Sequence, residues 1–358
     1  MRFVFKTSYD QDIRMFPHAG ALFWYGVLIV ALIAAPLLLD RYLLTQASFV
    51  AIFTIAGVGL MLLSGYTGQV SLGHAAFLAA GSYTETILMD AGLPFLISLP
   101  CSGLLAGVLG IAIGLPALRL AGIYLAIATL AFAFIVEEVL ARWESLTGGT
   151  SGLMVPELTI AGVSFYDETY FYYLCVGVAV LVMLAAINLL RSSTGRAWIA
   201  IRDSEIAAQS MGVNLAWYKT MAFAISAAFT GLAGALYAHQ LTYISPESYN
   251  ILLSVELLLL VVVGGLGSLH GAVFGAIFVI VLPELVAMLQ GALPEKMAQQ
   301  TGIKMGIFGL VIVLFMLYEP LGIYGRWYKI KHYFAMFPVY RKATFKRQKS
   351  YVKSDRLR

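Results

Sequence analysis

Residues 43–63 read LLTQASFVAIFTIAGVGLMLL, and none of these residues carries a charge. As an α-helix, a segment of this length would extend about 30 Å, which matches the hydrocarbon thickness of a bilayer. A helix satisfies all of its backbone hydrogen bonds internally, as a lipid environment requires. The segment therefore predicts a helix that spans a membrane.

Other apolar runs of similar length lie on both sides of this one. They are found at about 22–39, 72–89, 95–115, 120–140, 170–190, 220–238, 251–267, 271–290 and 304–318. Several of them contain Gly, Ser or Pro, so two or three are expected to be broken or re-entrant segments. We predict an all-α fold, a polytopic transmembrane bundle of about ten spanning or re-entrant helices.

The composition agrees with a membrane protein. Of the 358 residues, 60% are hydrophobic and 12% are charged, against about 25% charged in an ordinary soluble domain. This leaves too little polar sequence to cover a water-facing exterior. Cys101 and Cys175 both lie in apolar runs and are interpreted as small packing residues, without a disulfide or a redox role.

The distribution of basic residues predicts the orientation. If ten helices cross the membrane and both termini are cytoplasmic, 19 of the 23 Lys and Arg residues lie on the cytoplasmic side. Such a bias is typical of cytoplasmic segments. The loop at 191–219 is then internal and the loop at 141–169 external. Eight or nine crossings with a re-entrant segment also remain compatible with the pattern.

Three regions follow from this topology. Residues 1–21 form a cytoplasmic lead, residues 22–325 the transmembrane domain, and residues 326–358 a cytoplasmic tail. Eleven Lys and Arg residues lie after Gly325. A basic tail directly after an apolar span is expected to lie at an anionic membrane surface.

Several kinds of chemistry have no motif in this sequence. There is no Gly-x-x-x-x-Gly-Lys-Ser/Thr loop for phosphate, and not even one Gly-Lys pair. His-Glu-x-x-His, Cys-x-x-Cys and Gly-x-Ser-x-Gly are also absent, and the five histidines are scattered. We expect no catalytic activity, no metal, no cofactor and no nucleic-acid partner. Any ATP hydrolysis would take place on another polypeptide.

The internal loop at 191–219 contains a candidate docking helix. Asp203 is expected to cap this helix, Glu205 to lie in its first turn, and Gly212 to end it in the left-handed conformation. A helix of about eight residues would be ~12 Å long. Ala207 and Ala208 would allow the close approach of a soluble partner. An ordinary interfacial helix between two spans is the alternative interpretation.

The segment 65–74 places polar side chains among glycines at a membrane edge. Tyr66, Gln69, Ser71 and His74 are the candidates for a substrate pathway at an unwound helix end. The alternative is close helix packing with polar caps. We interpret His74 as a hydrogen-bonded structural residue in preference to a proton relay.

Five acidic residues fall within the predicted spans, all in the outer half of the membrane. They are Glu85, Glu137, Glu138, Glu256 and Glu284. Intramembrane carboxylates are candidates for function, and an acidic vestibule would suit a substrate ammonium. We retain Glu85 and Glu256 as substrate-pathway candidates. For Glu137 and Glu138 we favour a position near a helix end that reaches water.

Two segments of the chain resemble each other. Residues 71–77 (SLGHAAF) are similar to residues 268–274 (SLHGAVF), and each segment follows a glycine-rich turn. Transporters are often built from structural repeats. Small residues also recur wherever membrane helices pack closely, so both explanations stay open.

The order of motifs resembles a known family. Ala207, Ala208 and Gly212 resemble the loop by which permeases of ABC importers contact their ATPases, with the leading Glu displaced to Glu205. Residues 65–77, 122–132, 146–153 and 195–284 are similar to the permease subunits of branched-chain, or hydrophobic, amino-acid ABC importers. The resemblance covers most of residues 45–290 but neither the lead nor the tail.

This resemblance implies a multi-pass protein of the bacterial inner membrane. It implies a translocation subunit that works with a homologous permease, cytoplasmic ATP-binding subunits and an extracytoplasmic binding protein. Asp203, Glu205, Ala207, Ala208 and Gly212 would form the ATPase-coupling site. Urea and short-chain amide importers have similar permeases, so the substrate stays open. An ion-coupled secondary transporter, a channel and an intramembrane enzyme are the further alternatives.

Overall fold

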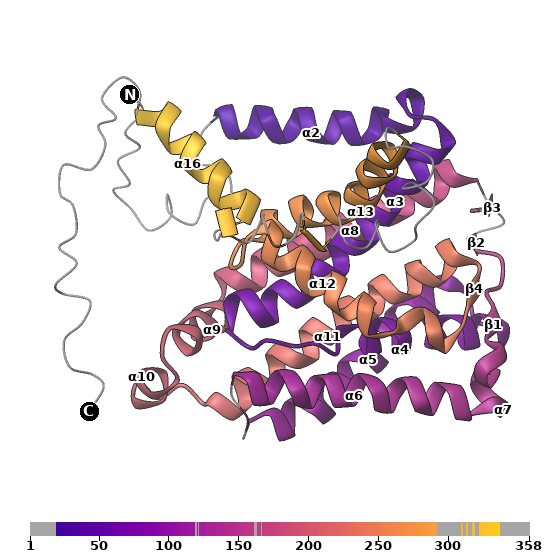
Figure 1. Ribbon diagram of the computed structural model, residues 1–358, viewed down its shortest axis with the longest axis horizontal. Helices are drawn as coiled ribbons and strands as arrows, with labels where there is room; N and C mark the ends of the chain where they lie inside the picture. Colours follow the sequence, from indigo (N-terminus) through magenta and orange to yellow (C-terminus); the bar gives the residue numbers. More distant parts are fainter. Residues whose placement is uncertain are drawn as a thin grey trace.

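Long helices make up most of the protein (Figure 1). The computed structural model describes residues 19–291 apart from 119, 121, 161, 162 and 166, and then residues 309, 310, 313, 317, 318 and 322–336. The long helices are α2 (Ala19–Leu38), α3 (Arg41–Leu60), α4 (His74–Asp90), α5 (Phe95–Ala117), α6 (Ile123–Arg142), α8 (Glu168–Arg191), α11 (Leu215–Leu241), α12 (Ile251–Gly264) and α13 (Leu269–Gly291).

Each apolar run predicted between residues 22 and 290 coincides with one of these helices. In the described part of the chain, six helices are long and apolar enough to cross a membrane, and two shorter apolar helices accompany them. Helix α4 is the more polar exception, and most of its residues are buried by other helices instead of facing lipid. The predicted run at 304–318 and both termini lie largely or entirely outside the described residues.

Helix α11 forms the centre of the bundle and packs against α3, α4 and α5. Small residues allow this packing, as they commonly do in membrane proteins. A Cβ atom added to Gly81 of α4 would lie 2.1 Å from the carbonyl oxygen of Gly231 in α11. The backbones of the two helices therefore touch, and no larger side chain fits between them.

The outer face of the bundle is apolar. Leu104 and Val108 on α5 expose 68% and 64% of their surface, and Leu181 on α8 exposes 67%. Apolar faces of this extent are unfavourable in water and are expected against lipid or another membrane subunit.

The chain leaves helical geometry between α3 and α4. Helix α3 continues as the short π-helix η1 (Met61–Tyr66), and residues 67–73 are non-helical before His74 begins α4. π-helical turns occur frequently at functional sites. The break covers the polar segment 65–74, which we name the first glycine turn.

The two ends of the bundle differ. Helices α9 (Ser193–Asp203) and α10 (Glu205–Ser210) lie at one end, and α7 (Glu144–Thr147) lies at the opposite end with the short strands (Figure 1). This separation is consistent with opposite sides of the membrane for the loops at 191–219 and 141–169.

Four two-residue strands qualify the all-α prediction. Strand β1 (Leu153–Met154) pairs antiparallel with β4 (Tyr243–Ile244), and β2 (Thr159–Ile160) pairs antiparallel with β3 (Val163–Ser164). Between α7 and β1 lies the 3-10 turn η2 (Gly149–Ser151), and between β4 and α12 lies η3 (Pro246–Tyr249). The β1–β4 pair ties the predicted outer loop to the segment that follows α11.

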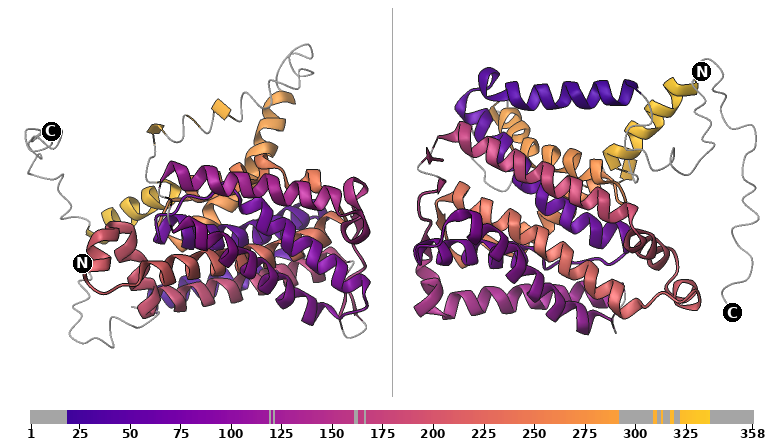
Figure 2. Two further views of the ribbon diagram at one scale, coloured as in Figure 1. Left: turned by 90° about the horizontal axis from the view of Figure 1, so that it is seen from below. Right: turned by 180° about the vertical axis from the view of Figure 1, so that it is seen from behind.

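Helix α16 (Gly322–Met336) packs against α12 and α13. It is the yellow helix in both views of Figure 2. The predicted start of the basic tail, residue 326, falls inside this helix. The first part of the tail is therefore an exposed helix with aromatic and basic side chains, including Trp327, Lys329 and Lys331.

Candidate functional site

The loop from Arg191 to Lys219 contains two short helices, α9 and α10, which we name the coupling segment. The prediction that Asp203 caps the second helix is wrong, because Asp203 is the last residue of α9. Ser204 is the cap, and its hydroxyl accepts a hydrogen bond from the Ala207 N–H at 3.3 Å. The Asp203 carboxylate is engaged by Arg202, whose Nε and Nη2 donate to Oδ1 at 3.2 and 3.1 Å.

Two other expectations for α10 agree with the geometry. Glu205 lies in its first turn, and Gly212 follows the helix in the left-handed region with a φ of 87°. The helix has six residues, so it is shorter than the eight expected from the sequence.

Buried contacts hold the coupling segment against α11. The Lys219 side chain is 6% exposed, and its Nζ lies 2.7 Å from Oε1 of Glu205. The Trp198 indole is fully buried and donates to the Tyr218 carbonyl at 2.9 Å. The ion pair therefore holds α10 against α11, and the Trp198 indole holds α9 against α11.

The outward face of α10 differs from the predicted one. Ala208 is 3% exposed and packs within the chain, whereas Ile206 and Met211 are each 84% exposed. Ala207 is also exposed. A hollow of about 400 Å³ lies beside α10, lined by residues that include Gln209 and Asn214. Ile206 and Met211 are thus the apolar groups that a soluble partner would meet.

The first glycine turn brings His74 into a buried network. The His74 Nδ1 lies 2.9 Å from the Ser71 hydroxyl, and its Nε2 lies 2.8 Å from the Ser226 hydroxyl of α11. The Ala75 N–H donates to the Ser254 hydroxyl of α12 at 3.0 Å. His74 and Ser71 are each 0% exposed. These contacts agree with a structural role for His74.

Gln69 and Tyr66 are better candidates for substrate contact than His74 and Ser71, because their polar groups are less fully engaged. Gln69 is 5% exposed, and its Nε2 has no hydrogen-bond partner among the described residues. Tyr66 is half-buried at the end of η1. A buried amide donor without a partner is unfavourable by about 1–3 kcal/mol, so it is available to a polar ligand or to water.

Glu85 is enclosed within the bundle. Its carboxylate accepts hydrogen bonds from Ser98 at 2.5 Å and Ser102 at 3.1 Å, and His239 Nε2 lies 3.5 Å away. Glu85 is 0% exposed. The group joins α4, α5 and α11, and a substrate could reach it only if these helices separated.

Glu256 lies half-buried on α12, and no basic residue of the described chain forms an ion pair with it. An aromatic cluster near it escaped the sequence analysis. Tyr249 lies 6.1 Å from both Tyr83 and Tyr237, measured between ring centroids. The Tyr83 and Tyr249 hydroxyls are buried and have no hydrogen-bond partner among the described residues. Tyr83 and Tyr249 lie far apart in the sequence, so no local sequence pattern predicts that they form a cluster.

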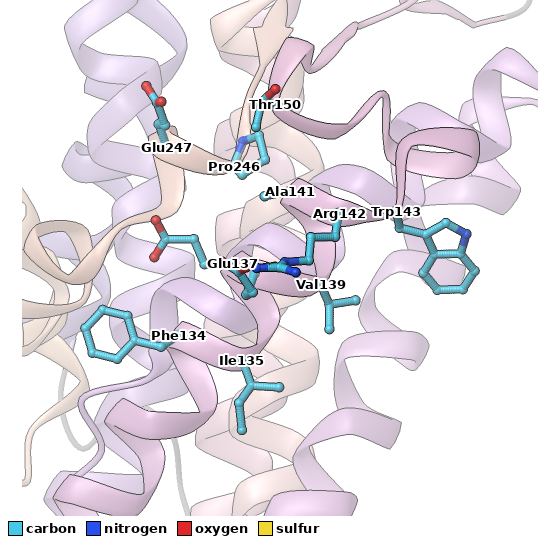
Figure 3. A pocket seen from close by; sticks show the side chains of 11 residues that line it. Phe134, Ile135, Glu137, Val139, Ala141, Arg142, Trp143, Thr150, Pro246 and Glu247 are labelled. Atoms are coloured by element: carbon cyan, nitrogen blue, oxygen red, sulfur yellow. Dashed lines mark hydrogen bonds and ion pairs between the residues drawn. The ribbon is translucent and has the colours of Figure 1, made fainter.

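A groove of about 1000 Å³ lies at the end of α6 (Figure 3), and we name it the outer groove after the predicted orientation. Glu138 and Arg142 form an exposed i,i+4 ion pair in it, as expected for residues near a helix end. The carboxylates of Glu137 and Glu247 point to the same side of the groove, whereas the Trp143 ring points away (Figure 3). Apolar walls, three carboxylates and one guanidinium, which is paired with Glu138, line this groove.

Arg202 and Lys219 were also missed as site residues. In the sequence, both residues count only toward the excess of basic residues on the predicted cytoplasmic side. Arg202 was detectable in principle, because it directly precedes the carboxylate that was expected to cap the helix.

Comparison with known proteins gives consistent results. Residues 42–316 match the model of the family "Branched-chain amino acid transport system / permease component". The chain is 36% identical over 327 residues to the high-affinity branched-chain amino acid transport system permease protein LivM of Escherichia coli, covering 84% of this chain and 74% of that protein. The corresponding protein of Salmonella typhimurium is 35% identical over the same shares.

A more distant relative imports a different molecule. The autoinducer 2 import system permease protein LsrC of Salmonella paratyphi B is 26% identical over 283 residues, covering 73% of this chain and 77% of that protein. No solved structure matches the chain.

Proposed function

The chain belongs to the family of permease components of branched-chain amino acid transport systems, and from this premise we propose that it carries these amino acids across the bacterial inner membrane as one subunit of an ATP-driven importer. The observation that carries the proposal is the 36% identity to LivM over 84% of the chain. The apolar exterior of a multi-pass helical bundle supports the membrane location.

ATP hydrolysis takes place on separate subunits in this proposal, because the sequence has no phosphate-binding loop of its own. The exposed Ile206 of α10 and Met211 directly after it, next to a hollow, support a docking surface for a cytoplasmic ATPase. Glu205 and Gly212 position the helix, and Ala208 anchors it. A homologous permease and an extracytoplasmic binding protein complete the importer, and anionic lipid attracts the basic tail.

The substrate pathway passes the first glycine turn and the outer groove. Gln69 offers a buried amide donor, and Tyr66 and Glu256 offer half-buried polar groups. Glu137 and Glu247 in the groove suit the ammonium of an amino acid, and the exposed Arg142 guanidinium would exchange Glu138 for its carboxylate. Phe134 and Ile135 suit the apolar side chain. Ser71, His74 and Glu85 support this pathway as enclosed packing groups.

Two other functions are weighed against this one. A permease for urea or short-chain amides would have the same fold but would need no paired charges for a zwitterion. An ion-coupled transporter would need no docking surface for an ATPase. The outer groove and the outward face of α10 therefore favour an amino-acid importer driven by ATP.

Uptake by the reconstituted complex tests the proposal. The complex, with its second permease and ATPases, is placed in proteoliposomes and supplied with loaded binding protein and radiolabelled leucine. We expect ATP-dependent uptake that unlabelled isoleucine and valine inhibit and that urea and acetamide do not. Inhibition by urea, or uptake driven by an ion gradient without ATP, would contradict the proposal.

A further inference from the structure

Arg202 reaches from the coupling segment into the membrane domain. Its Nη1 donates to the carbonyl oxygen of Gly65 at 3.2 Å, across 137 residues of sequence. The contact joins the last turn of α9 to the end of the π-helix η1. Arg202 therefore touches the first glycine turn at the point where α3 stops being helical.

The same side chain touches a second glycine-rich turn, which connects α12 to α13 and comprises residues 264–268. A Cβ atom added to Gly267, which has a φ of 84°, would lie 3.3 Å from Arg202 Nη1. A Cβ atom added to Gly68, with a φ of 73°, would lie 3.1 Å from Arg202 Cγ. The stem and guanidinium of Arg202 thus fit against glycine surfaces in both turns.

The two turns also touch each other. A Cβ atom added to Gly65 would lie 2.7 Å from the backbone nitrogen of Gly267. The Gly267 N–H donates to the sulfur of Met61 in η1 at 3.3 Å. The first turn runs into residues 71–77 and the second into residues 268–274, the two segments that are similar in sequence.

The Arg202 guanidinium can bind Asp203 and the first glycine turn at the same time. Its Nε and Nη2 donate to the Asp203 carboxylate while Nη1 donates to the Gly65 carbonyl. A planar guanidinium can make these contacts together, whereas a lysine ammonium is a single point charge on a flexible stem. Asp203 therefore orients Arg202 instead of capping α10.

The other buried contacts of the coupling segment are made with α11 and not with the glycine turns. Glu205 and Trp198 attach it to Lys219 and Tyr218, which both belong to α11. Among the polar contacts of α9 and α10 in the described chain, the Arg202 contact is the one that leads to the glycine turns.

We propose that Arg202 is the positioning residue that transmits the movement of the coupling segment to both glycine turns, and through them to α3, α4, α12 and α13. This inference rests on the proposed function, because it assumes that an ATPase moves α10. A displaced α10 would shift the Arg202 guanidinium, and the Gly65 carbonyl and Gly267 would follow. Glycine at these positions permits the close contact and the backbone change that such a movement requires.

The test compares leucine uptake with ATP hydrolysis in one preparation of the whole importer. The variants are Arg202→Gln, Arg202→Lys and Asp203→Asn. Arg196→Gln is the matched control, because Arg196 lies on the same helix and is exposed, and its side chain bonds only to the nearby Arg191 carbonyl among the described residues. The readouts are co-purified ATPase, ATP hydrolysed and leucine imported per ATP.

We expect Arg202→Gln to retain the ATPase and to hydrolyse ATP, but to import at least about tenfold less leucine per ATP, within the roughly 5–150-fold range of coupling effects. Arg202→Lys and Asp203→Asn should show intermediate losses, and Arg196→Gln none. Wild-type leucine per ATP in Arg202→Gln would overturn the inference. Loss of the ATPase from that variant would also overturn it, because Arg202 would then belong to the docking surface.

Two further results keep the outcome decisive. If Arg202→Gln does not insert, Asp203→Asn decides, and an unchanged ratio in that variant overturns the inference. The wild type measured in parallel separates the two claims. A wild-type complex that imports no leucine contradicts the proposed function, whereas a wild type and an Arg202→Gln variant that import equally well contradict the role of Arg202.

Discussion

The Nζ atom of Lys219 lies 2.7 Å from Oε1 of Glu205, and this ion pair joins α10 to α11. The lysine side chain is 6% exposed and the glutamate side chain 45% exposed. Removal of the glutamate charge would leave a buried ammonium without its partner. For a fully buried pair this is unfavourable by about 3–5 kcal/mol, and solvent around Glu205 reduces the effect here.

We therefore expect Glu205→Gln to displace α10 and to weaken co-purification of the ATPase. The double variant Glu205→Gln with Lys219→Met removes both charges and should restore part of that binding, because no buried charge then lacks a partner. Quantified ATPase bound per permease measures both effects. Full binding by Glu205→Gln alone would show that the ion pair does not position α10.

Glu85 provides a test of the substrate pathway. Its carboxylate is 0% exposed and accepts hydrogen bonds from Ser98 and Ser102. Glutamine can keep a hydrogen bond to both hydroxyls, so we expect Glu85→Gln to retain uptake and to change stability by no more than about 1 kcal/mol. Glu85→Ala should be less stable by on the order of 1–3 kcal/mol, because Ser98 and Ser102 lose this acceptor and keep only backbone carbonyl acceptors, and His239 loses the neighbouring carboxylate.

Thermal unfolding and leucine uptake of these two variants are measured together. If Glu85→Gln remains folded but stops importing leucine, the carboxylate charge takes part in transport, and a purely structural role is wrong.

The orientation of the chain can be measured with introduced cysteines. Cys101 and Cys175 are first replaced, and single cysteines are then placed at Glu168 or Ser204. The excess of basic residues around Ser204 predicts that this end is cytoplasmic. An impermeant thiol reagent should label position 168 in intact cells and position 204 only after permeabilisation. Labelling of position 204 from outside would reverse the topology.

The helices were predictable because the signal is local. The run at 43–63 predicts its own helix, since its length and lack of charge allow few other structures in a membrane. The position of the coupling segment in the sequence was predictable, but its capping residue and helix length were not. Asp203 and Ser204 are both good capping residues, and the choice between them depends on Arg202, which holds the Asp203 carboxylate.

Contacts between distant residues could not be inferred from the sequence. Ala207 and Ala208 are the same residue type, and the packing of α10 against α9 and α11 leaves Ala208 as the buried one. Arg202 reaches Gly65 across 137 residues. Tyr83 and Tyr249 meet only because α4 and the η3 turn lie side by side in the bundle.

The central claim is that α10 docks an ATPase, and Ile206 offers the most direct measurement. Its side chain is 84% exposed, so Ile206→Asp should leave folding intact while placing a charge in an apolar contact. A desolvated charge without a partner weakens a protein interface by about 2–5 kcal/mol. Met154→Asp is the matched control, because Met154 is 76% exposed and lies in β1 at the opposite end of the bundle.

The amount of ATPase that co-purifies with each variant decides the claim. We predict that Ile206→Asp inserts into the membrane, loses most of the bound ATPase and abolishes ATP-driven leucine uptake, whereas Met154→Asp keeps the ATPase. Wild-type ATPase binding and uptake in Ile206→Asp would contradict the account.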